Sequence, residues 1–401
     1  MAKKETQKTI LCAWEIGGEL GHISRFSAIT KALELEGHHI VLAFKDLSRA
    51  YPLFQDTEAT LLQAPVWLPK VTMQRPVACL ADTLLCMGYL EDEALDCLVQ
   101  AWESIIDLVK PDLVIFDYSP TAMLALLDNP LPKILIGTGF ADPIAGKRIV
   151  DWRPYPTEDQ LIERQEQMVL ERINLVRQRR DKPSLNCMTE LFAVDRVVIS
   201  TFAELDLYSG RKDADYCIGS TAQLVSTPVN FLHEDRPRIL AYLKPAHPNI
   251  DMLVAALAQC KASVFIACPK GSAKLFAPYV SDRFQFSLDL VDLQGAMSSV
   301  DLFVGHGNAS SCKESLIAGN PVIVFPVQLE QLLTGRKLQE AGFGVLVEKI
   351  PGVEEMVKLF NDLLDNSEHY RANIKNLLIR HPKPRLDVAE AVSAAVKNLL
   401  L

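Results

Sequence analysis

Short apolar runs of strand length alternate with segments of helical periodicity along most of the chain. Residues 9–15 have the pattern of a buried strand, and in residues 23–35 apolar side chains recur at the spacing of one helix face. A helix is also predicted around residues 91–109. Further strands are predicted at residues 39–44, 113–117, 133–137 and 196–200. This β-α-β order predicts a parallel sheet with helices on both faces.

The same pattern restarts in the second half of the chain. Strands are predicted at residues 238–243, 263–268, 284–288, 301–305 and 322–326, with a helix near 249–260. Between the two series, residues 221–237 lack periodicity and are rich in Ser, Thr and Pro, which is typical of a linker. We therefore expect an α/β protein with two Rossmann-like, doubly wound domains facing across a cleft. The expected boundaries are an N-terminal domain at 1–220, the linker at 221–237, a C-terminal domain at 238–385, and a helix at 386–401 that packs back across the domains.

The composition narrows the class of protein. A chain of 401 residues exceeds the usual size of one hydrophobic core, which agrees with two domains. The formal net charge of −9 argues against a nucleic-acid partner and against adhesion to anionic membranes. The 9 cysteines are scattered and form no CxxC pair, so they indicate buried thiols. No apolar run approaches a membrane span or signal peptide, and we expect a cytoplasmic protein.

The first predicted strand-to-helix corner, residues 15–25, carries candidate chemistry. Three glycines, Gly17, Gly18 and Gly21, allow the backbone to turn sharply or to pass close to a ligand. Their spacing does not match the dinucleotide-binding GxGxxG pattern. His22 follows them, and a histidine at this rim of a sheet can act as a general base because its ordinary pKa lies near neutrality. The alternative is a histidine that caps or packs against the helix.

Asp117 stands at the carboxyl end of the strand predicted at 113–117. In a parallel sheet this end lies on the same edge as the first corner, so the carboxylate is placed to hydrogen-bond His22 and fix its tautomer. The alternative is a helix N-cap, because a helix is also expected to start just after it.

A second corner, residues 303–326, places His306, Gly307 and Asn308 directly before a predicted helix. One interpretation is a plain helix start, with Ser311 and Glu314 forming a capping box. The other is a phosphate cradle, because free backbone N–H groups at a helix start bind phosphate. In that case His306 would donate to the phosphate and Glu314 would accept from a ribose diol. The residue types alone leave both interpretations open.

The chain resembles the GT-B glycosyltransferases of the family 1 type, the UDP-glycosyltransferase and macrolide glycosyltransferase group. Their C-terminal signature has the form H-G-G-x-N-S-x-x-E-(A/S)-x-x-x-G-x-P, followed by P-x-x-x-(D/E)-Q. The matching positions here are His306, Gly307, Ser311, Glu314, Ser315, Gly319, Pro321, Pro326, Glu330 and Gln331. The G-H corner at Gly21-His22 and the strand ending in Asp117 are similar to the N-terminal half of the same family.

The resemblance implies a function and a role for each site residue. His22 would be the catalytic base and Asp117 its partner. The donor diphosphate would be held by His306, Gly307, Asn308, Ser310 and Ser311. The ribose would be held by Glu314, and the sugar hydroxyls by Glu330 and Gln331. The implied reaction is an inverting, metal-independent transfer of a hexose from a nucleotide diphosphate sugar, a UDP-sugar, to a hydroxyl of a small apolar acceptor, with no further cofactor.

Several positions depart from the family pattern. Asn308 replaces the second glycine of the signature, and Ser310 replaces its asparagine. The strand that opens the second domain runs into residues 243–248 instead of a Gly-Ser turn. Lys244 is a candidate to meet the diphosphate there, and a solvated lysine is the alternative that we favour. These departures keep two alternatives open: a non-catalytic sugar-nucleotide-binding protein, and a GT-B enzyme of another reaction such as a sugar-nucleotide epimerase.

Two further predictions concern the acceptor and a metal. The irregular apolar segment 64–90 and Phe140 are candidates to line an acceptor pocket, through Trp67, Met87 and Tyr89, although core packing is the alternative for each. The acidic pair Asp213 and Asp215 is interpreted as a solvated turn rather than a metal site. A homodimer is left open.

Overall fold

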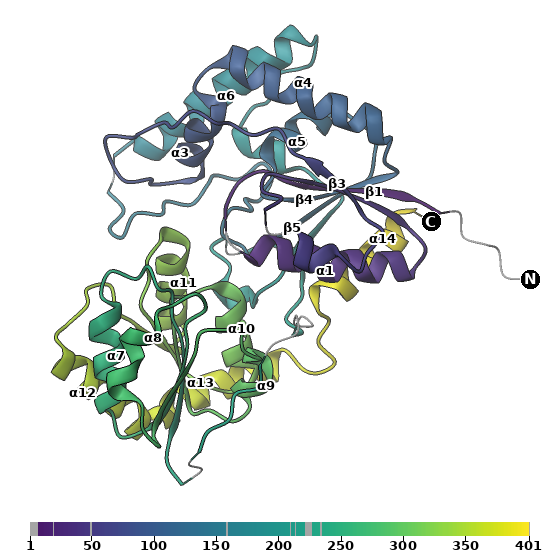
Figure 1. The fold of residues 1–401 in the computed structure, drawn as a ribbon. Coiled ribbons are helices and arrows are strands. Elements are labelled where there is room, and N and C mark those ends of the chain that lie inside the picture. Colours follow the sequence, from purple (N-terminus) through teal and green to yellow (C-terminus); the bar gives the residue numbers. More distant parts are fainter. Residues whose placement is uncertain are drawn as a thin grey trace, which may run out of the picture. The chain divides into compact units, whose positions relative to one another are not determined.

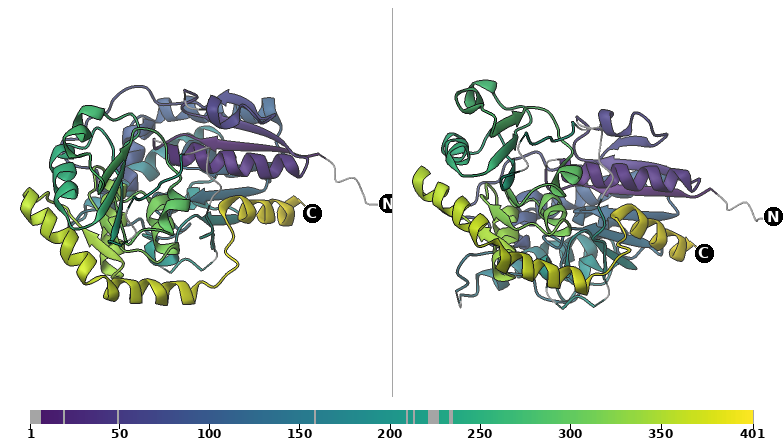
Figure 2. Two further views of the ribbon diagram at one scale, coloured as in Figure 1. Left: turned by 60° about the horizontal axis from the view of Figure 1, so that its bottom comes forward. Right: turned by 90° about the horizontal axis from the view of Figure 1, so that it is seen from below.

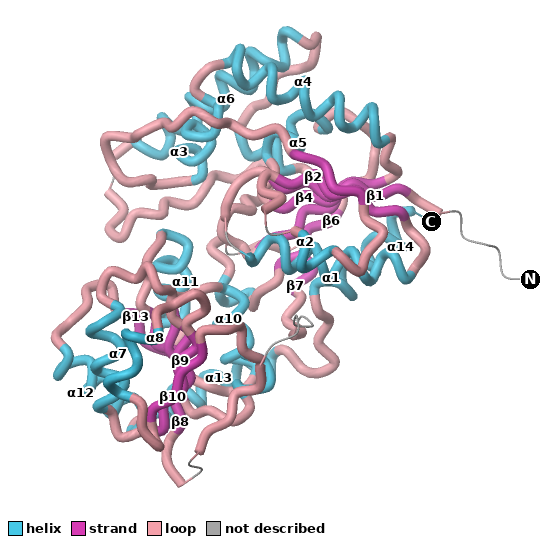
Figure 3. The backbone as a smooth tube through the Cα atoms, in the orientation of Figure 1, coloured by secondary structure: helices cyan, strands magenta, loops and turns pink. Residues whose placement is uncertain are grey.

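Two parallel sheets organise the chain in this computed structural model, which describes residues 7–18, 20–48, 50–157, 159–208, 210–212, 214–220, 227–232 and 235–400. The chain divides into two compact units. Unit 1 comprises residues 1–221 and 386–401, and unit 2 comprises residues 222–385. Figure 3 shows the strands of each unit gathered at its centre with helices around them.

The sheet of unit 1 has seven strands in the order β3-β2-β1-β4-β5-β6-β7, all parallel. The strands are β1 (Thr9–Trp14), β2 (His39–Phe44), β3 (Thr60–Gln63), β4 (Leu113–Asp117), β5 (Lys133–Gly137), β6 (Arg196–Ile199) and β7 (Ala214–Tyr216). Every residue of β4 and β5 is buried, as expected for central strands covered on both faces. The strand order reverses between β1 and β4, which makes their carboxyl ends the switch point of this sheet.

Helices cover both faces of this sheet (Figure 1). They are α1 (Leu20–Leu35), α2 (Tyr51–Phe54), α3 (Leu80–Leu84), α4 (Asp92–Val109), α5 (Pro120–Leu126), α6 (Leu161–Arg179) and α14 (Val388–Leu400). On one face α4 packs against α5 and α6, and on the other α14 packs against α1 and β6. Figure 2 shows α14, in yellow, running beside α1, in purple. The last helix of the chain therefore completes the core of unit 1.

The sheet of unit 2 has six parallel strands in the order β10-β9-β8-β11-β12-β13. Its strands are β8 (Arg238–Tyr242), β9 (Ser263–Ala267), β10 (Phe284–Ser287), β11 (Leu302–Gly305), β12 (Val322–Val324) and β13 (Gly344–Leu346). Its helices are α7 (Ile250–Gln259), α8 (Ala273–Phe276), α9 (Leu293–Met297), α10 (Ala309–Ile317), α11 (Leu329–Glu340), α12 (Val353–Asp365) and α13 (Ser367–Arg380). The switch point of this sheet lies between β8 and β11.

The predicted fold class, two doubly wound α/β units with parallel sheets, is confirmed. The sequence analysis did not predict the short strands β3, β7 and β13. Ala214 and Asp215 begin the edge strand β7, so the turn predicted there is wrong for these two residues, while Asp213 lies outside the described residues. Residues 221–226 and 233–234 of the predicted linker also lie outside them.

Candidate functional site

The switch point of unit 1 brings His22 and Asp117 into contact. Asp117 is the last residue of β4 and pairs in register with Trp14, the last residue of β1. His22 lies in the first turn of α1, which begins a few residues after β1. Nδ1 of His22 and Oδ1 of Asp117 are 2.8 Å apart. The contact predicted from the sequence is therefore present, while the catalytic roles of both residues stay predictions.

The imidazole of His22 is held on two further sides. The indole of Trp14 stacks on it with a ring-centroid distance of 5.2 Å. Gly17 has a φ of +86°, and a Cβ at this position would lie 2.6 Å from Nε2 of His22. The backbone of Gly17 is fixed in turn by Lys45, whose Nζ donates to its carbonyl at 2.8 Å. Among the residues that the structure describes, none hydrogen-bonds Nε2 of His22.

Arg25 supplies a positive charge to the same contact. Its Nη2 donates to Oδ2 of Asp117 at 2.7 Å, and its Nε is 3.3 Å from the same oxygen. Burial alone would raise the pKa of Asp117, but the charges of Arg25 and His22 outweigh burial and hold this pKa below its ordinary value. The carboxylate is therefore ionised at neutral pH. The sequence analysis missed Arg25; the available signal was its position three residues after His22, on the same face of a helix.

Two other carboxyl groups lie near this edge of the sheet. Glu15 directly follows β1, and its carboxylate accepts from the backbone N–H groups of Thr121 and Ala122 at the start of α5. Burial nevertheless raises the pKa of Glu15 to about 7. Burial also raises the pKa of Asp142 to about 6, with the neighbouring charge of Asp117 contributing. Unit 1 thus concentrates titratable groups at its switch point.

The switch point of unit 2 is occupied by His306, which directly follows β11 and is 2% exposed. Its Nδ1 lies 2.8 Å from the carbonyl oxygen of Phe325, and because a carbonyl only accepts, Nδ1 carries the proton. Its Nε2 accepts from the backbone N–H of Lys244 at 2.8 Å. His247 stacks on the ring at a centroid distance of 5.3 Å. The loop that replaces the family's Gly-Ser turn therefore closes onto His306.

Gly307 and Gln331 join α11 to the same corner. Gly307 has a φ of +94°, and a Cβ here would lie 2.6 Å from the carbonyl oxygen of Gln331. The side chain of Gln331 is fully buried, with its oxygen accepting from the Val327 N–H and its nitrogen donating to Oδ1 of Asn308 at 2.7 Å. Both polar groups of Gln331 are therefore held by protein partners.

The helix start predicted from the sequence is wrong by three residues. Helix α10 begins at Ala309 with Asn308 as its N-cap residue, so Ser311 is not the N-cap of a capping box. The Ser311 hydroxyl donates to the carbonyl of Asn308 instead. The side chain of Asn308 bonds to Gln331 and does not cap the helix. The backbone N–H groups of Ala309, Ser310 and Ser311 consequently have no hydrogen-bond partner among the described residues.

The other signature residues surround this helix start. Ser310 is exposed, and Glu314 and Glu330 are partly exposed on α10 and α11. Three elements that are distant in sequence, β8, β11 and α11, thus bring their ends together around the N-terminus of α10. The sequence analysis identified the residues of the signature but not the partners of His306 and Gln331.

The candidate acceptor residues divide into core and surface. Tyr89 is fully buried, with its hydroxyl 3.3 Å from that of Thr121, so core packing applies to it. Phe140 stacks on the buried Trp152. Trp67 packs beside Gly88 and is partly exposed, as is Met87. Within this group, Trp67, Met87 and Phe140 keep accessible surface for a ligand.

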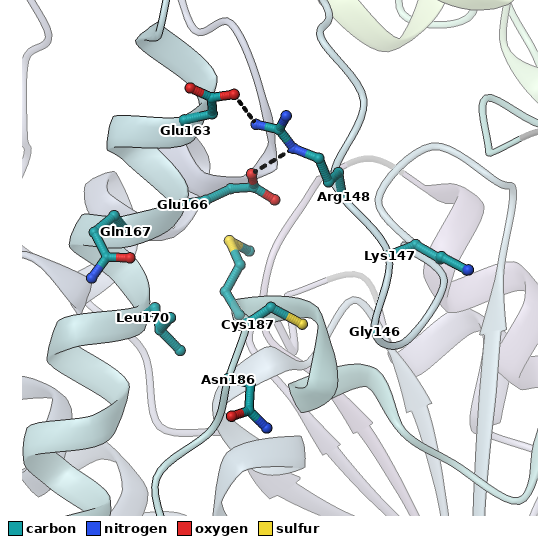
Figure 4. Close-up of a pocket in the computed structure, with 10 residues that line it drawn as sticks. Gly146, Lys147, Arg148, Glu163, Glu166, Gln167, Leu170, Asn186 and Cys187 are labelled. Carbon is teal, nitrogen blue, oxygen red and sulfur yellow. Dashed lines mark ion pairs between the residues drawn. The ribbon is translucent and has the colours of Figure 1, made fainter.

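A separate pocket of about 250 Å³ lies in unit 1 between α6 and the loops at 146–148 and 186–188. Figure 4 shows Arg148 extending from its loop toward Glu163 and Glu166 on α6, with which it forms ion pairs. Neither the predicted site residues nor the candidate acceptor residues line this pocket. Its ion pairs connect the loop to the helix, which is a structural role.

Among the described residues, no group of three or more His, Cys, Asp and Glu side chains is placed to hold a metal ion. None of the helices in this part of the chain has the length and apolar character needed to span a membrane.

Comparison with known proteins relates the chain to glycosyltransferases. No protein-family model matches the sequence. The NDP-glycosyltransferase YjiC of Bacillus subtilis (strain 168) is 30% identical over 86 residues, a match that spans 20% of this chain and 22% of that protein. The matched segment is therefore about a fifth of the relative's length.

Solved structures match over nearly the whole chain. The calicheamicin glycosyltransferase CalG4 has a TM-score of 0.71 at 15% identity, covering 98% of this chain and 98% of its own. The Streptomyces sp. SF2575 glycosyltransferase SsfS6, complexed with thymidine diphosphate, has a TM-score of 0.63 at 17% identity, covering 98% and 100%. The resemblance stated from the sequence is thus confirmed at the level of the fold, and the chain has the GT-B fold of these glycosyltransferases.

Proposed function

We propose that this protein is an inverting glycosyltransferase that moves a hexose from a nucleotide diphosphate sugar to a hydroxyl group of a small apolar acceptor. The observation that carries the proposal is the His22–Asp117 contact at the switch point of unit 1. The ionised Asp117 accepts the proton on Nδ1 of His22, so the lone pair lies on Nε2, which no described residue occupies. This arrangement suits a general base.

In the proposed reaction, Nε2 of His22 takes the proton of the acceptor hydroxyl. The acceptor oxygen attacks the anomeric carbon, and the bond from this carbon to the diphosphate oxygen breaks with its electron pair staying on the diphosphate. A single displacement of this kind inverts the anomeric configuration. Asp117 stabilises the imidazolium that forms, as the carboxylate of a catalytic triad does.

We assign the donor to unit 2. The N–H groups at the start of α10, which have no hydrogen-bond partner among the described residues, support the binding of the diphosphate, because they point outward from a helix N-terminus. Glu314 is assigned to the ribose and Glu330 to the sugar hydroxyls, as the family resemblance implies. We propose that the leaving charge is met by these N–H groups without a metal ion.

His306 and Gln331 receive a positioning role in this proposal. Their polar atoms are bonded to Lys244, Phe325, Val327 and Asn308 in the described state, so a direct contact with the donor would first require one of these bonds to break. Both side chains fix the loop from Gly307 to Asn308 that precedes α10. They would thereby hold the diphosphate site in place without touching it.

The nucleotide of the donor is proposed to be uridine, from the family resemblance. One structural neighbour was solved with thymidine diphosphate, which makes a thymidine donor the second choice. The acceptor is proposed to contact Trp67, Met87 and Phe140, since all three keep accessible apolar surface.

The test combines binding and turnover. The protein is incubated with UDP- and dTDP-hexoses, its thermal shift is recorded, and release of the diphosphate is followed with and without a panel of aromatic and polyketide alcohols. We expect a donor that raises the melting temperature and an acceptor that accelerates diphosphate release, with His22→Ala abolishing the acceleration and Glu314→Ala weakening the thermal shift. Donor binding with no release across all acceptors would support the non-catalytic alternative. A changed sugar stereocentre in the NMR spectrum of the donor would support the epimerase alternative.

A further inference from the structure

A buried arginine shares the hydrogen-bonding edge of the proposed base. Arg25 lies one turn after His22 on α1, and its side chain is 9% exposed. Its guanidinium bonds to Oδ2 of Asp117, while Oδ1 of the same carboxylate faces His22. The same Nη2 also lies 3.1 Å from Nδ1 of His22. A positive charge is therefore fixed at the edge of an imidazole that is proposed to acquire a positive charge itself.

Nδ1 of His22 faces an acceptor and a donor at once. A protonated Nδ1 donates to Asp117 at 2.8 Å, and the lone pair then lies on Nε2. An unprotonated Nδ1 would accept from Arg25 at 3.1 Å, and the proton on Nε2 would block its use as a base. The first state is favoured, because an unprotonated Nδ1 would place its lone pair against an ionised carboxylate oxygen.

The function of Arg25 follows from this geometry. By binding Oδ2, the guanidinium prevents the carboxylate from rotating away from the imidazole, so Oδ1 stays aligned with Nδ1. The neutral ring then carries its proton on Nδ1 and its lone pair on Nε2, which is the form that can accept a proton.

We propose that Arg25 is a positioning residue for the His22–Asp117 pair, which fixes the orientation of Asp117 and thereby holds the neutral ring of His22 in the Nδ1–H tautomer. This inference rests on the proposed function, because it assigns Arg25 a part in the same proton transfer. Its structural content, the tautomer of His22, is measurable without any turnover.

Two further charged groups lie near the pair in the part of the chain that the structure describes. Directly after β2, Lys45 bonds to the Gly17 carbonyl. From the segment after β5, Asp142 interacts electrostatically with Asp117. Both groups remain in variants of Arg25.

The test is the ¹⁵N NMR spectrum of the histidine rings at alkaline pH, with His22 assigned through the loss of its signals in His22→Asn. In the wild type we expect the proton of the neutral ring on Nδ1, and in folded Arg25→Met a mixture with the Nε2–H tautomer, because Asp117 is no longer held against Nδ1. Arg25→Lys keeps a charge but lacks the planar guanidinium and should not restore the wild-type tautomer. A wild-type tautomer in folded Arg25→Met would overturn the inference.

A second readout separates positioning from a merely structural role. If transfer is observed, Arg25→Met should lower kcat while the KM for the donor stays unchanged, whereas a loosened fold would also lower the melting temperature and weaken donor binding and would contradict the proposal. A changed tautomer of His22 in a protein that transfers no sugar would overturn the proposed function while leaving the positioning role of Arg25 intact.

Discussion

Each unit has a histidine at a matching place, His22 in unit 1 and His306 in unit 2. Each lies close to the switch point of a parallel sheet. This point is between β1 and β4 in unit 1 and between β8 and β11 in unit 2. In unit 1, His22 follows the first of these strands and contacts a carboxylate at the end of the other. In unit 2, His306 follows the second strand, and the backbone of Lys244 after the first strand contacts it. The same topology thus gives His22 a side-chain partner and His306 backbone partners.

This difference decides what each histidine can do. The carboxylate partner of His22 gains a favourable interaction when the ring is charged, and Nε2 is left without a described partner, so proton transfer is available. The ring nitrogens of His306 are hydrogen-bonded to a carbonyl and to an N–H group, and these two bonds require the neutral Nδ1–H tautomer. A histidine at a switch point therefore predicts a ligand site. The partner of its imidazole decides whether the ring can transfer a proton or holds the backbone in place.

The largest expected effects come from replacing the two histidines, because one variant should lose turnover and the other should lose stability. Replacing His22 with Ala removes the proposed base, and we expect turnover to fall about 10³-fold with donor affinity unchanged. Replacing His306 with Ala leaves a buried carbonyl and a buried N–H group unpaired, and we expect a loss of about 2–4 kcal/mol in the stability of unit 2. Steady-state kinetics and urea unfolding followed by circular dichroism measure the two effects.

Tryptophan fluorescence provides the control, because all 4 tryptophans of the chain lie in unit 1. The His306→Ala protein should keep the fluorescence transition of the wild type while part of its circular dichroism transition moves to lower urea. The comparison fails if His306→Ala reduces turnover as strongly as His22→Ala in a protein of unchanged stability, since His306 would then act on the donor itself.

The second prediction concerns the glycines that border the two histidine sites. A methyl group at Gly307 would meet the backbone of Gln331, which cannot move alone, so we expect Gly307→Ala to cost about 2–3 kcal/mol of stability and to weaken donor binding. A methyl group at Gly17 would meet the imidazole of His22, which can move, so we expect about 10- to 100-fold slower turnover through misplacement of the base. Calorimetric donor titration and kinetics report these outcomes.

Matched controls exist in both units. Gly37 and Gly319 have φ values of +88° and +87°, and a Cβ at either position would meet nothing within 4 Å. Alanine at these positions adds the backbone strain alone. If Gly37→Ala slowed turnover as much as Gly17→Ala, crowding of the imidazole would not be the cause.

The sequence predicted most of the fold because its central strands are apolar and buried. The apolar runs at β1, β2, β4 and β5 leave little ambiguity in periodicity, and the β-α-β order then determines a parallel sheet. The short edge strands β7 and β13 were not predicted, because three residues are too few to show a hydrophobic pattern and their pairing depends on neighbouring strands.

A side-chain contact could be predicted from the sequence where the topology of the sheet specifies the positions of both partners. His22 and Asp117 are such a case, because the ends of adjacent parallel strands must meet. Helix α10 is the opposite case: the local pattern favoured Ser311 as the N-cap, but a bond from Gln331, 23 residues away, holds Asn308 at that position. The closure of Lys244 onto His306 spans 62 residues and involves a backbone N–H group, for which no residue type gives a signal.

The smallest expected effect is the pH dependence that the switch point of unit 1 contributes. At the switch point of unit 2, burial lowers the pKa of His247, whereas in unit 1 burial raises the pKa of Glu15 to about 7 from its ordinary 4.5. A raised pKa means that the folded protein binds the proton more tightly than the unfolded chain does. This contribution to stability is therefore complete below about pH 4.5 and is lost as the pH rises through about 7.

In Glu15→Gln this titration is absent, so we expect the stability of unit 1 to vary with pH between 5 and 8 by about 1–2 kcal/mol less than in the wild type. Urea unfolding followed by tryptophan fluorescence at each pH measures it, and the raised pKa of Asp142 supplies a smaller slope of the same sign that remains in the variant. The amide also replaces one acceptor oxygen at the N-terminus of α5 with a donor, so the variant should be less stable than the wild type at pH 5 and should approach it as the pH rises. A wild-type protein whose unit 1 gains stability from pH 5 to pH 8 would show that the carboxylate is stabilised by the N–H groups of α5 more than it is penalised by burial.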